Sequence, residues 1–410
     1  MTHRLYYDDA YCTEFDATVT ATGQDSNGLW VKLDRSAFYP TSGGQPHDTG
    51  VLTYAGGTTR VVDVAVNHGE VLHYVQQALP PGTAVNGRID WARRFDHMQQ
   101  HLGEHLLAAE IARQAQGYTI GLHIGADDAT IDVTLPDGAT RLGQEMWLRI
   151  EEAVNKHITG NLPVRCWFPT PQELAALPLR KEPTVDDHVR VVAAGEVEMV
   201  ACGGTHPSTT GQVGLLKVLF DEPVRGKMRV HFVCGGRALQ VFRTYQQAAT
   251  ETSRLLSSPV QEVPDAVQKL QQRMSDSEAA LARLRRASAQ AQLTDALQAV
   301  QPGQHGWRVL AHTVEEADME LLSQLAGDLV QASCVAVLLH GTAAGRDTYV
   351  FARSPQGSVD MAALLREVGL RGGGRPDFAR GSAAQGDGQA ILQAACDLAQ
   401  QRMEEGERAR

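Results

Sequence analysis

The sequence has 410 residues, 43% of them hydrophobic, which predicts two or three domains with cores of their own. It carries 37 Lys and Arg against 48 Asp and Glu, a net charge of −11 that disfavours coating nucleic acid by bulk charge but permits a local basic groove. The start resembles no secretory signal, no stretch has the apolar length of a membrane span, and the six cysteines are scattered. We therefore predict a cytoplasmic protein with reduced thiols and no membrane partner.

The first 88 residues alternate short apolar runs with Gly-rich turns. Examples are GLWVKLD at 28–34 and GEVLHYVQQAL at 69–79. Period-two alternation broken by Gly, Asn and Asp is typical of antiparallel strands. Residues 1–88 are therefore predicted to form a small β-barrel domain.

Helical spacing begins at Trp91 and continues through Met98, Leu102 and Leu106. Beyond it, strand-like runs such as ATIDVTL and MRVHFVCG surround a second helical stretch at about 141–158. Residues 89–250 are therefore predicted to form an α+β domain.

The pattern of apolar residues along the sequence changes again after about residue 250. Apolar residues step by threes and fours, as on one face of a long helix, and Ser277 and Ser288 interrupt them. We predict a helical linker at 251–300, either an antiparallel hairpin or a helix packed on its own protein. Apolar runs typical of buried strands then alternate with helical stretches and predict a small α/β domain at 301–410. Whether two chains form a homodimer through this domain is left open. The heptad-like positions are Val260, Val263, Val267, Leu270, Met274, Leu281 and Leu284.

Two pairs of residues have the spacing of metal ligands. His101 and His105 lie one helical turn apart on the same face, and Cys202 and His206 flank two glycines that let both side chains converge. Each pair alone has an ordinary explanation, such as a buried thiol or a turn histidine. Together they form a His₃Cys set that suits Zn²⁺ and predicts one zinc per chain.

The combination CGGTH and upstream HxxxH resembles the editing domain of alanyl-tRNA synthetase and its free-standing relatives, the AlaX proteins. AFYPTSGGQPHDTG at 37–50 is similar to the Gly-rich loop of that family's N-terminal barrel. RGGGRPDFARGSA at 371–383 resembles the Gly-rich signature of the DHH-associated domain that ends alanyl-tRNA synthetases. The resemblance covers essentially the whole chain.

The resemblance implies a long-form AlaX protein, because the chain starts at the barrel and leaves no room for an aminoacylation core. Its implied activity is hydrolysis of the ester in tRNA(Ala) mischarged with serine, or with glycine. A pocket for alanine cannot reject these amino acids strongly, whereas a second site can hydrogen-bond the serine hydroxyl that alanine lacks.

Within this resemblance, Thr41 is the candidate reader of the serine hydroxyl, or else an ordinary turn threonine. Gly43, Gly44 and Gln45 are predicted to bind the ester or the ribose. Glu104 is either a general base or a solvent-facing helix residue, since the synthetase editing domains usually carry threonine there. The last candidate, His123, is a polar pocket residue or simply a histidine at a strand end.

Arg371, Arg375 and Arg380 are predicted to contact tRNA, in a Gly-rich loop whose backbone amides hold phosphate. Two alternatives of other classes remain open. HLGEH also matches the inverted zinc-protease signature H-x-x-E-H, with Glu104 as base, although this leaves CGGTH unexplained. The second is a tRNA-binding module whose zinc is purely structural.

Overall fold

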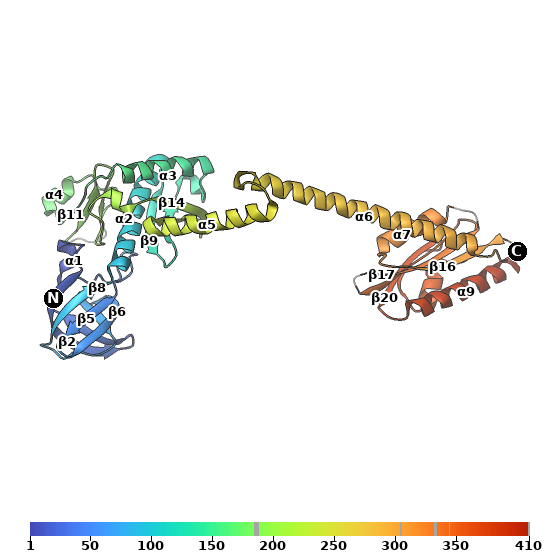
Figure 1. The fold of residues 1–410 in the computed structure, drawn as a ribbon, viewed down its shortest axis with the longest axis horizontal. Helices are drawn as coiled ribbons and strands as arrows, with labels where there is room; N and C mark the ends of the chain where they lie inside the picture. Colours follow the sequence, from blue (N-terminus) through green and yellow to red (C-terminus); the bar gives the residue numbers. More distant parts are fainter. Residues whose placement is uncertain (184–187, 304–305, 332–333, 344, 409–410) are drawn as a thin grey trace. The chain divides into compact units, whose positions relative to one another are not determined.

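The computed structural model describes residues 1–183, 188–303, 306–331, 334–343 and 345–408. The chain divides into two compact units, Met1–Glu251 and Thr252–Arg410 (Figure 1). Both mix helices with sheets, and the α+β class predicted from the sequence is confirmed. The bounds of the four segments drawn from the sequence remain predictions.

The first unit begins with a closed barrel, in the order β2-β3-β7-β6-β5-β8. Strand β2 shows why these residues form a barrel: Phe15, Ala17 and Val19 are buried while Glu14, Asp16 and Thr18 between them face outward. This alternation gives each strand one face for the barrel core. The barrel strands are β2 (Glu14–Asp25), β3 (Gly28–Leu33), β5 (Gly50–Tyr54), β6 (Gly57–Asn67), β7 (Glu70–Val75) and β8 (Ala84–Ile89).

The rest of the first unit is built around one helix, α2 (Trp91–Ala115), which is buried on nearly all sides from His97 to Ile111. It packs against α3 (Gln144–Thr159) and a sheet of order β14-β15-β10-β9. A second sheet, β11-β12-β13, carries the Cys202 turn after its last strand. The strands are β9 (Tyr118–Ile124), β10 (Ala129–Thr134), β11 (Val164–Trp167), β12 (Val191–Ala194), β13 (Glu198–Ala201), β14 (Leu216–Val224) and β15 (Lys227–Cys234).

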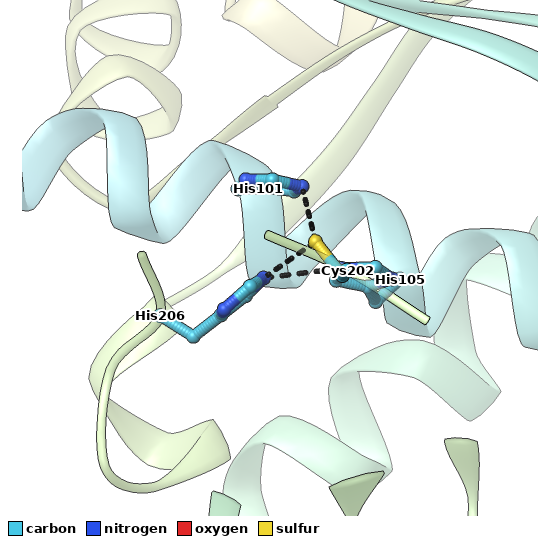
Figure 2. A group of neighbouring side chains, drawn as sticks. All are labelled: His101, His105, Cys202 and His206. Atoms are coloured by element: carbon cyan, nitrogen blue, oxygen red, sulfur yellow. Dashed lines mark hydrogen bonds between the residues drawn. The ribbon is translucent and has the colours of Figure 1, made fainter. Parts of the chain in front are cut away.

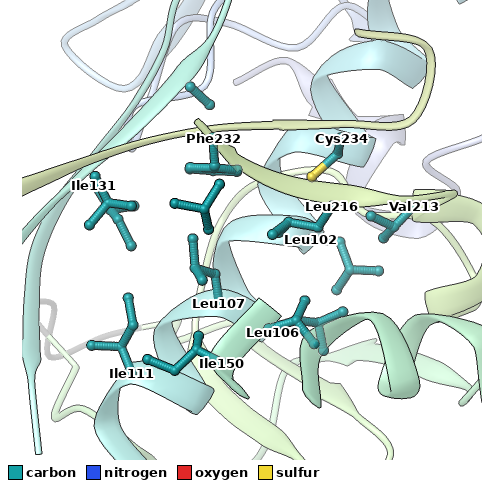
Figure 3. Packing of buried hydrophobic residues seen from close by; sticks show 14 of the residues in the cluster. Leu102, Leu106, Leu107, Ile111, Ile131, Ile150, Val213, Leu216, Phe232 and Cys234 are labelled. Atoms are coloured by element: carbon teal, nitrogen blue, oxygen red, sulfur yellow. The ribbon is translucent and has the colours of Figure 1, made fainter. Parts of the chain in front are cut away.

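Figure 3 shows the core around α2, where Leu102, Leu106 and Ile111 meet side chains from the sheet and from α3. Gly103 lets the helix approach β15 closely, because a Cβ there would lie 2.2 Å from Cys234 Sγ. Cys234 is completely buried in this core. The core therefore fixes the helix that presents His101 and His105. Smaller elements of this unit are β1 (His3–Arg4), α1 (Leu5–Asp8), β4 (Arg35–Ser36) and α4 (Pro171–Ala176). The helix α5 (Gly235–Leu256) begins in this unit, and its last residues belong to the second.

The second unit holds a mixed sheet of order β16-β17-β18-β20-β19, in which only the β16–β17 pair is parallel. Helices α7, α8 and α9 pack on this sheet around cores of aliphatic and aromatic side chains. Its elements are β16 (Arg308–Val314), α7 (Met319–Leu329), β17 (Val335–Ala343), β18 (Arg346–Arg353), α8 (Met361–Glu367), β19 (Arg371–Arg375), β20 (Phe378–Ala384) and α9 (Gly388–Arg408).

From Val263 onward the heptad-like segment is a single helix, α6 (Val263–Ala299), and Val260 lies in a 3₁₀ turn before it (Val260–Glu262). Ala289 and Leu293 near its C-terminal end are buried against the core of the second unit. The earlier heptad-like positions are not buried: Leu270, Met274 and Leu284 are 52%, 62% and 69% exposed. Packing within the second unit thus covers only the last part of the predicted face.

All six cysteines are unpaired, in agreement with the predicted reduced thiols. A search of the described residues finds no helix that is both long and apolar enough to cross a membrane.

Candidate metal centre

The structure brings the four predicted ligands together from two parts of the first unit. His101 and His105 project from adjacent turns of α2, and Cys202 and His206 come from the turn that follows β13 (Figure 2). Their ligand atoms all lie within 4.8 Å of one another, and three of the side chains are buried. The i, i+4 spacing stacks the two helix histidines with ring centroids 5.0 Å apart.

Three of the distances between ligand atoms are close to those around a tetrahedral ion. His105 Nε2 lies 3.1 Å from His206 Nε2, and Cys202 Sγ lies 3.4 Å from His101 Nε2 and 3.7 Å from His206 Nε2. A tetrahedral zinc with ordinary bond lengths separates two nitrogens by about 3.3 Å and nitrogen from sulfur by about 3.6 Å. The donor set therefore fits one zinc ion.

The protonation states also suit a metal. Burial lowers the pKa of His101 to about 3 and holds those of His105 and His206 well below the usual value, so all three rings are neutral. Burial raises the pKa of the Cys202 thiol to about 12 in the protein alone. Since a thiolate is the ligand form, a cation at this point would supply the charge that burial otherwise disfavours.

Gln45 holds the first histidine in its ligand orientation. Its side chain is fully buried, and its amide oxygen accepts hydrogen bonds from His101 Nδ1 (2.8 Å) and from the Thr205 backbone N–H (3.1 Å). Its amide nitrogen donates to the Thr205 hydroxyl at 2.7 Å. A proton on His101 Nδ1 leaves Nε2 free to face the ion, which is the usual arrangement around metal-binding histidines. Gln45 thus acts through His101, and the predicted contact with the ester or ribose remains a prediction.

Two buried carboxylates lie behind His105. Glu104 Oε2 is 3.6 Å and Glu198 Oε1 is 4.0 Å from His105 Nδ1, on the ring nitrogen that faces away from the cluster. Glu198 is paired with Arg180 at 2.9 Å. Burial raises the pKa of Glu104 to about 7, while Arg180 lowers it and Glu198 raises it further. At 7% exposure Glu104 is not the solvent-facing residue that one alternative required, because the rest of the first unit covers this turn of α2.

The barrel loop is anchored to α2 by a buried ion pair. Arg94 and Asp48 are both fully buried and bonded to each other, and Arg94 also donates to the carbonyls of Ala10 and Ala37. Gly44 adopts φ +84° and passes so near Leu122 that a Cβ would lie 2.0 Å from its carbonyl oxygen. Gly43 is also in the left-handed region, at φ +59°. These features hold Gln45 against the metal ligands.

An open cleft of about 800 Å³ reaches the cluster at Cys202 and Gly203. Ser42 lines it, whereas Thr41 does not: the exposed Thr41 shares a hydrogen bond with His47 Nδ1 at 3.1 Å. His123 lies exposed on β9, opposite Thr130 in the sheet, and the structure records no contact between it and the four ligands. Their predicted roles in substrate binding remain predictions.

The three arginines predicted to contact tRNA are exposed, as a nucleic-acid contact requires. The predicted Gly-rich loop is instead a β-hairpin, in which β19 pairs antiparallel with β20. The glycines permit this pairing, because a Cβ at Gly372 or Gly374 would lie about 2 Å from a carbonyl oxygen of β20. The backbone of β19 pairs with β20 and does not form a phosphate-binding loop. The prediction that backbone amides of a Gly-rich loop hold phosphate is therefore wrong. The arginines are Arg371, Arg375 and Arg380.

The sequence alone did not indicate the roles of several residues around the metal centre. Thr205 was visible only as part of CGGTH, and Glu198 stood in an ordinary strand. Arg190, 6% exposed, donates to the backbone oxygens of Cys202 (3.2 Å) and Gly204 (2.8 Å) and so shapes the ligand turn. Such contacts arise from tertiary packing across up to 160 residues of sequence, as between Gln45 and Thr205, which no local pattern encodes.

Two protein-family models match the chain. The model for class II (A) tRNA synthetases matches residues 5–93, and the model for the second additional domain of threonyl and alanyl tRNA synthetases matches residues 189–230. The second match contains both Cys202 and His206.

The chain is 32% identical over 406 residues to the alanyl-tRNA editing protein AlaX-L of Pyrococcus horikoshii, covering 93% of this chain and 94% of that protein. It is 34% identical to the alanine–tRNA ligase of Pyrobaculum neutrophilum, with 96% of this chain and 44% of the ligase covered. The chain thus spans less than half the length of this ligase. A crystal structure of the C-Ala domain of Aquifex aeolicus alanyl-tRNA synthetase matches 25% of this chain and 95% of its own at 25% identity, with a TM-score of 0.22 that supports no conclusion about the fold.

Proposed function

The chain belongs to the family of the alanyl-tRNA editing protein AlaX-L, and on this premise we propose that it is a zinc-dependent deacylase of mischarged tRNA(Ala). Its substrates are Ser-tRNA(Ala) and Gly-tRNA(Ala), and it does not itself attach amino acids. The observation that carries the proposal is the convergence of three neutral imidazoles and one cysteine sulfur beside an open cleft that Cys202 lines.

The proposed reaction is hydrolysis of an ester. Water adds to the carbonyl carbon, the bond to the terminal ribose oxygen breaks, and that oxygen takes up a proton, which leaves a free amino acid and an uncharged tRNA. A bound zinc would hold the site in shape through all four ligands or, with one ligand displaced, would polarise the carbonyl or hold the substrate's amino group.

The chain's own residues prepare this site. Gln45 fixes the tautomer of His101, and Arg190 fixes the backbone of the Cys202 turn. Glu104 and Glu198 face the outer nitrogen of His105, a position that suits an orienting carboxylate better than a general base acting on water at the cluster.

Thr41 remains the proposed reader of the serine hydroxyl. Thr41→Val should lower the rate for Ser-tRNA(Ala) more than for Gly-tRNA(Ala), with Ser42→Ala as the comparison.

The zinc-protease alternative uses His101, Glu104 and His105 and needs an open coordination position. Here Cys202 and His206 complete a four-ligand set, and Glu104 lies behind the His105 ring rather than over the cluster. Both observations favour the editing function.

A direct test compares peptide and Ser-tRNA(Ala) hydrolysis on one zinc-loaded preparation, followed by removal of the metal with a chelator. We expect turnover of Ser-tRNA(Ala) alone, and its loss on chelation while circular dichroism still reports a folded protein. Peptide cleavage would support the protease. Unfolding together with the loss of metal, with no turnover before it, would support a structural zinc.

A further inference from the structure

The cleft beside the metal centre has walls of a particular chemistry. Tyr7 comes from α1, Phe168 follows β11, and Arg190 precedes β12, while Arg4 ends β1. The cleft thus gathers two aromatic rings and two guanidinium groups within the first unit. Cys202 and Gly203 also line it, and Tyr7 Oη would lie 3.5 Å from a Cβ on Gly203.

The aromatic wall is a row of packed rings that ends in one exposed ring. Phe168 is 47% exposed and meets Tyr7 edge to face, with centroids 5.6 Å apart. Tyr7 in turn packs against the buried Tyr6 at 4.7 Å, and Tyr6 packs against Tyr39 at 5.3 Å. An exposed phenyl ring backed by a packed aromatic row offers a flat face on which a nucleic-acid base can stack.

The cationic wall lacks acidic partners of its own. Guanidinium carbons of Arg4 and Arg190 lie 5.8 Å and 5.4 Å from the Tyr7 ring centroid, and neither forms an ion pair with a described residue. The carboxylate in the cleft, on Asp8, is bonded to His3 at 2.9 Å. The Nε of Arg190 is buried and has no hydrogen-bond partner among the residues that the structure describes. Arg4 donates to the Gly69 carbonyl oxygen (3.1 Å) and to the Tyr7 hydroxyl (3.4 Å), so the structure fixes its position at the cleft. An unpartnered buried donor beside guanidinium groups that lack acidic partners indicates a site for an anionic or oxygen-rich ligand.

We propose that this cleft binds the 3′-terminal nucleotide of the tRNA, with its base stacked on Phe168 and its phosphate facing Arg4. The Arg190 Nε donates to a sugar or phosphate oxygen of the same nucleotide. This placement directs the terminal ribose, and the ester it carries, toward the cluster, of which Cys202 lines the cleft. The volume, about 800 Å³, lies in the range of sites that hold such ligands. The inference rests on the proposed function, because it names the part of the tRNA that the site holds.

The test uses the full-length protein loaded with zinc and two substitutions, Phe168→Ala and Arg4→Gln. Matched controls in the same unit are Phe220→Ala, at a phenyl ring that is 53% exposed, and Arg149→Gln, at an exposed arginine on α3. The probes are 5′-AMP, adenosine and inorganic phosphate as inhibitors and as titrants in calorimetry, together with the kinetics of Ser-tRNA(Ala) hydrolysis. Zinc content is measured for every variant.

We expect Phe168→Ala to weaken 5′-AMP and adenosine about tenfold and to lower kcat/KM about tenfold, mainly through KM, because a base–aromatic stack is lost. Phe168→Trp should restore both. Arg4→Gln should weaken 5′-AMP but not adenosine, and both variants should keep their zinc. The controls should match the wild type.

Unchanged KM and unchanged 5′-AMP binding in Phe168→Ala would overturn the inference while leaving the deacylase proposal in place. If the wild type hydrolyses no mischarged tRNA, the proposed function fails, but binding of 5′-AMP that is lost in Phe168→Ala alone would still establish the nucleotide site. Absence of both activity and nucleotide binding would overturn both proposals.

Discussion

Gly204 lies so close to His101 that the metal centre depends on its missing side chain. A Cβ there would lie 2.1 Å from His101 Cε1 and 3.0 Å from Gln45 Oε1, whereas a Cβ on Gly203 would meet only Tyr7 Oη at 3.5 Å. We predict that Gly204→Ala displaces the ring and weakens zinc binding at least tenfold, while Gly203→Ala binds zinc as the wild type does. Competition with a chromogenic chelator measures both, and equal affinities would show that the turn tolerates the methyl group.

Gln45 provides a second residue-scale prediction. Gln45→Leu has a similar volume but cannot accept from His101 Nδ1 or from the Thr205 N–H. We expect zinc affinity to fall by about 10- to 100-fold, since outer hydrogen bonds of this kind orient the metal ligand. Gln45→Glu keeps an acceptor and should lose less. If all three proteins bind zinc equally, Gln45 does not act through His101, and its predicted contact with the substrate becomes the better explanation.

At the scale of elements, the Arg94–Asp48 pair joins the barrel loop to α2. Both side chains are fully buried, so removing one leaves an uncompensated charge in the interior. Arg94→Met should destabilise the first unit by about 3–5 kcal/mol, whereas the double variant Arg94→Met/Asp48→Leu should recover part of that loss. Denaturant unfolding of the three proteins tests this. A double variant less stable than Arg94→Met would contradict it.

The barrel contains a histidine that should make it sensitive to acid. Burial lowers the pKa of His73 to about 4; its Nε2 lies 2.7 Å from Ser36 Oγ and its Nδ1 lies 3.2 Å from the Val31 carbonyl oxygen. In the unfolded chain an ordinary histidine binds a proton below about pH 6.5, so the folded state loses stability as the pH falls from there toward 4, by about 3 kcal/mol in all. Unfolding measured between pH 7 and 4 should show this slope, and His73→Asn should make it less steep, while the other buried histidines, whose pKa values are also lowered, keep the rest. An equally steep curve in the variant would assign the sensitivity to other groups.

Much of this element order could be predicted from the sequence. Alternation in β2 and helical spacing in α2 are local properties, and His101 with His105 were recognisable because one helix carries both. The pairing of RGGGR with β20, and the contacts of Glu198 and Arg190 with the ligand turn, were not predictable. They depend on which distant segments meet in the folded chain, and neither periodicity nor motif spacing records that.

At the scale of the whole molecule, each unit has its own cores, so the two units can carry separate functions. We propose that the exposed arginines of the second unit add a second tRNA contact to the one at the metal centre, which raises avidity without altering either site. A chain ending after Leu256, the last residue of α5, should keep its zinc and some hydrolysis of Ser-tRNA(Ala) but bind tRNA markedly more weakly. Replacing Arg371, Arg375 and Arg380 together by Gln should mimic this and flatten the salt dependence of binding. Equal affinity over a range of salt would assign the second unit to dimerisation or stability instead.

The most direct measurement of the central claim is the deacylation of Ser-, Gly- and Ala-tRNA(Ala) side by side, with zinc quantified in the same preparation. The account predicts about one zinc per chain and hydrolysis of the seryl ester at a rate that follows the zinc content. Alanyl ester turnover should be at least about tenfold slower, because a group that reads the serine hydroxyl is left unpaired by alanine. Glycine leaves the same group unpaired, so the glycyl ester should also react more slowly than the seryl ester. Protein purified without chelator that contains no zinc, or that hydrolyses all three esters equally, would contradict it.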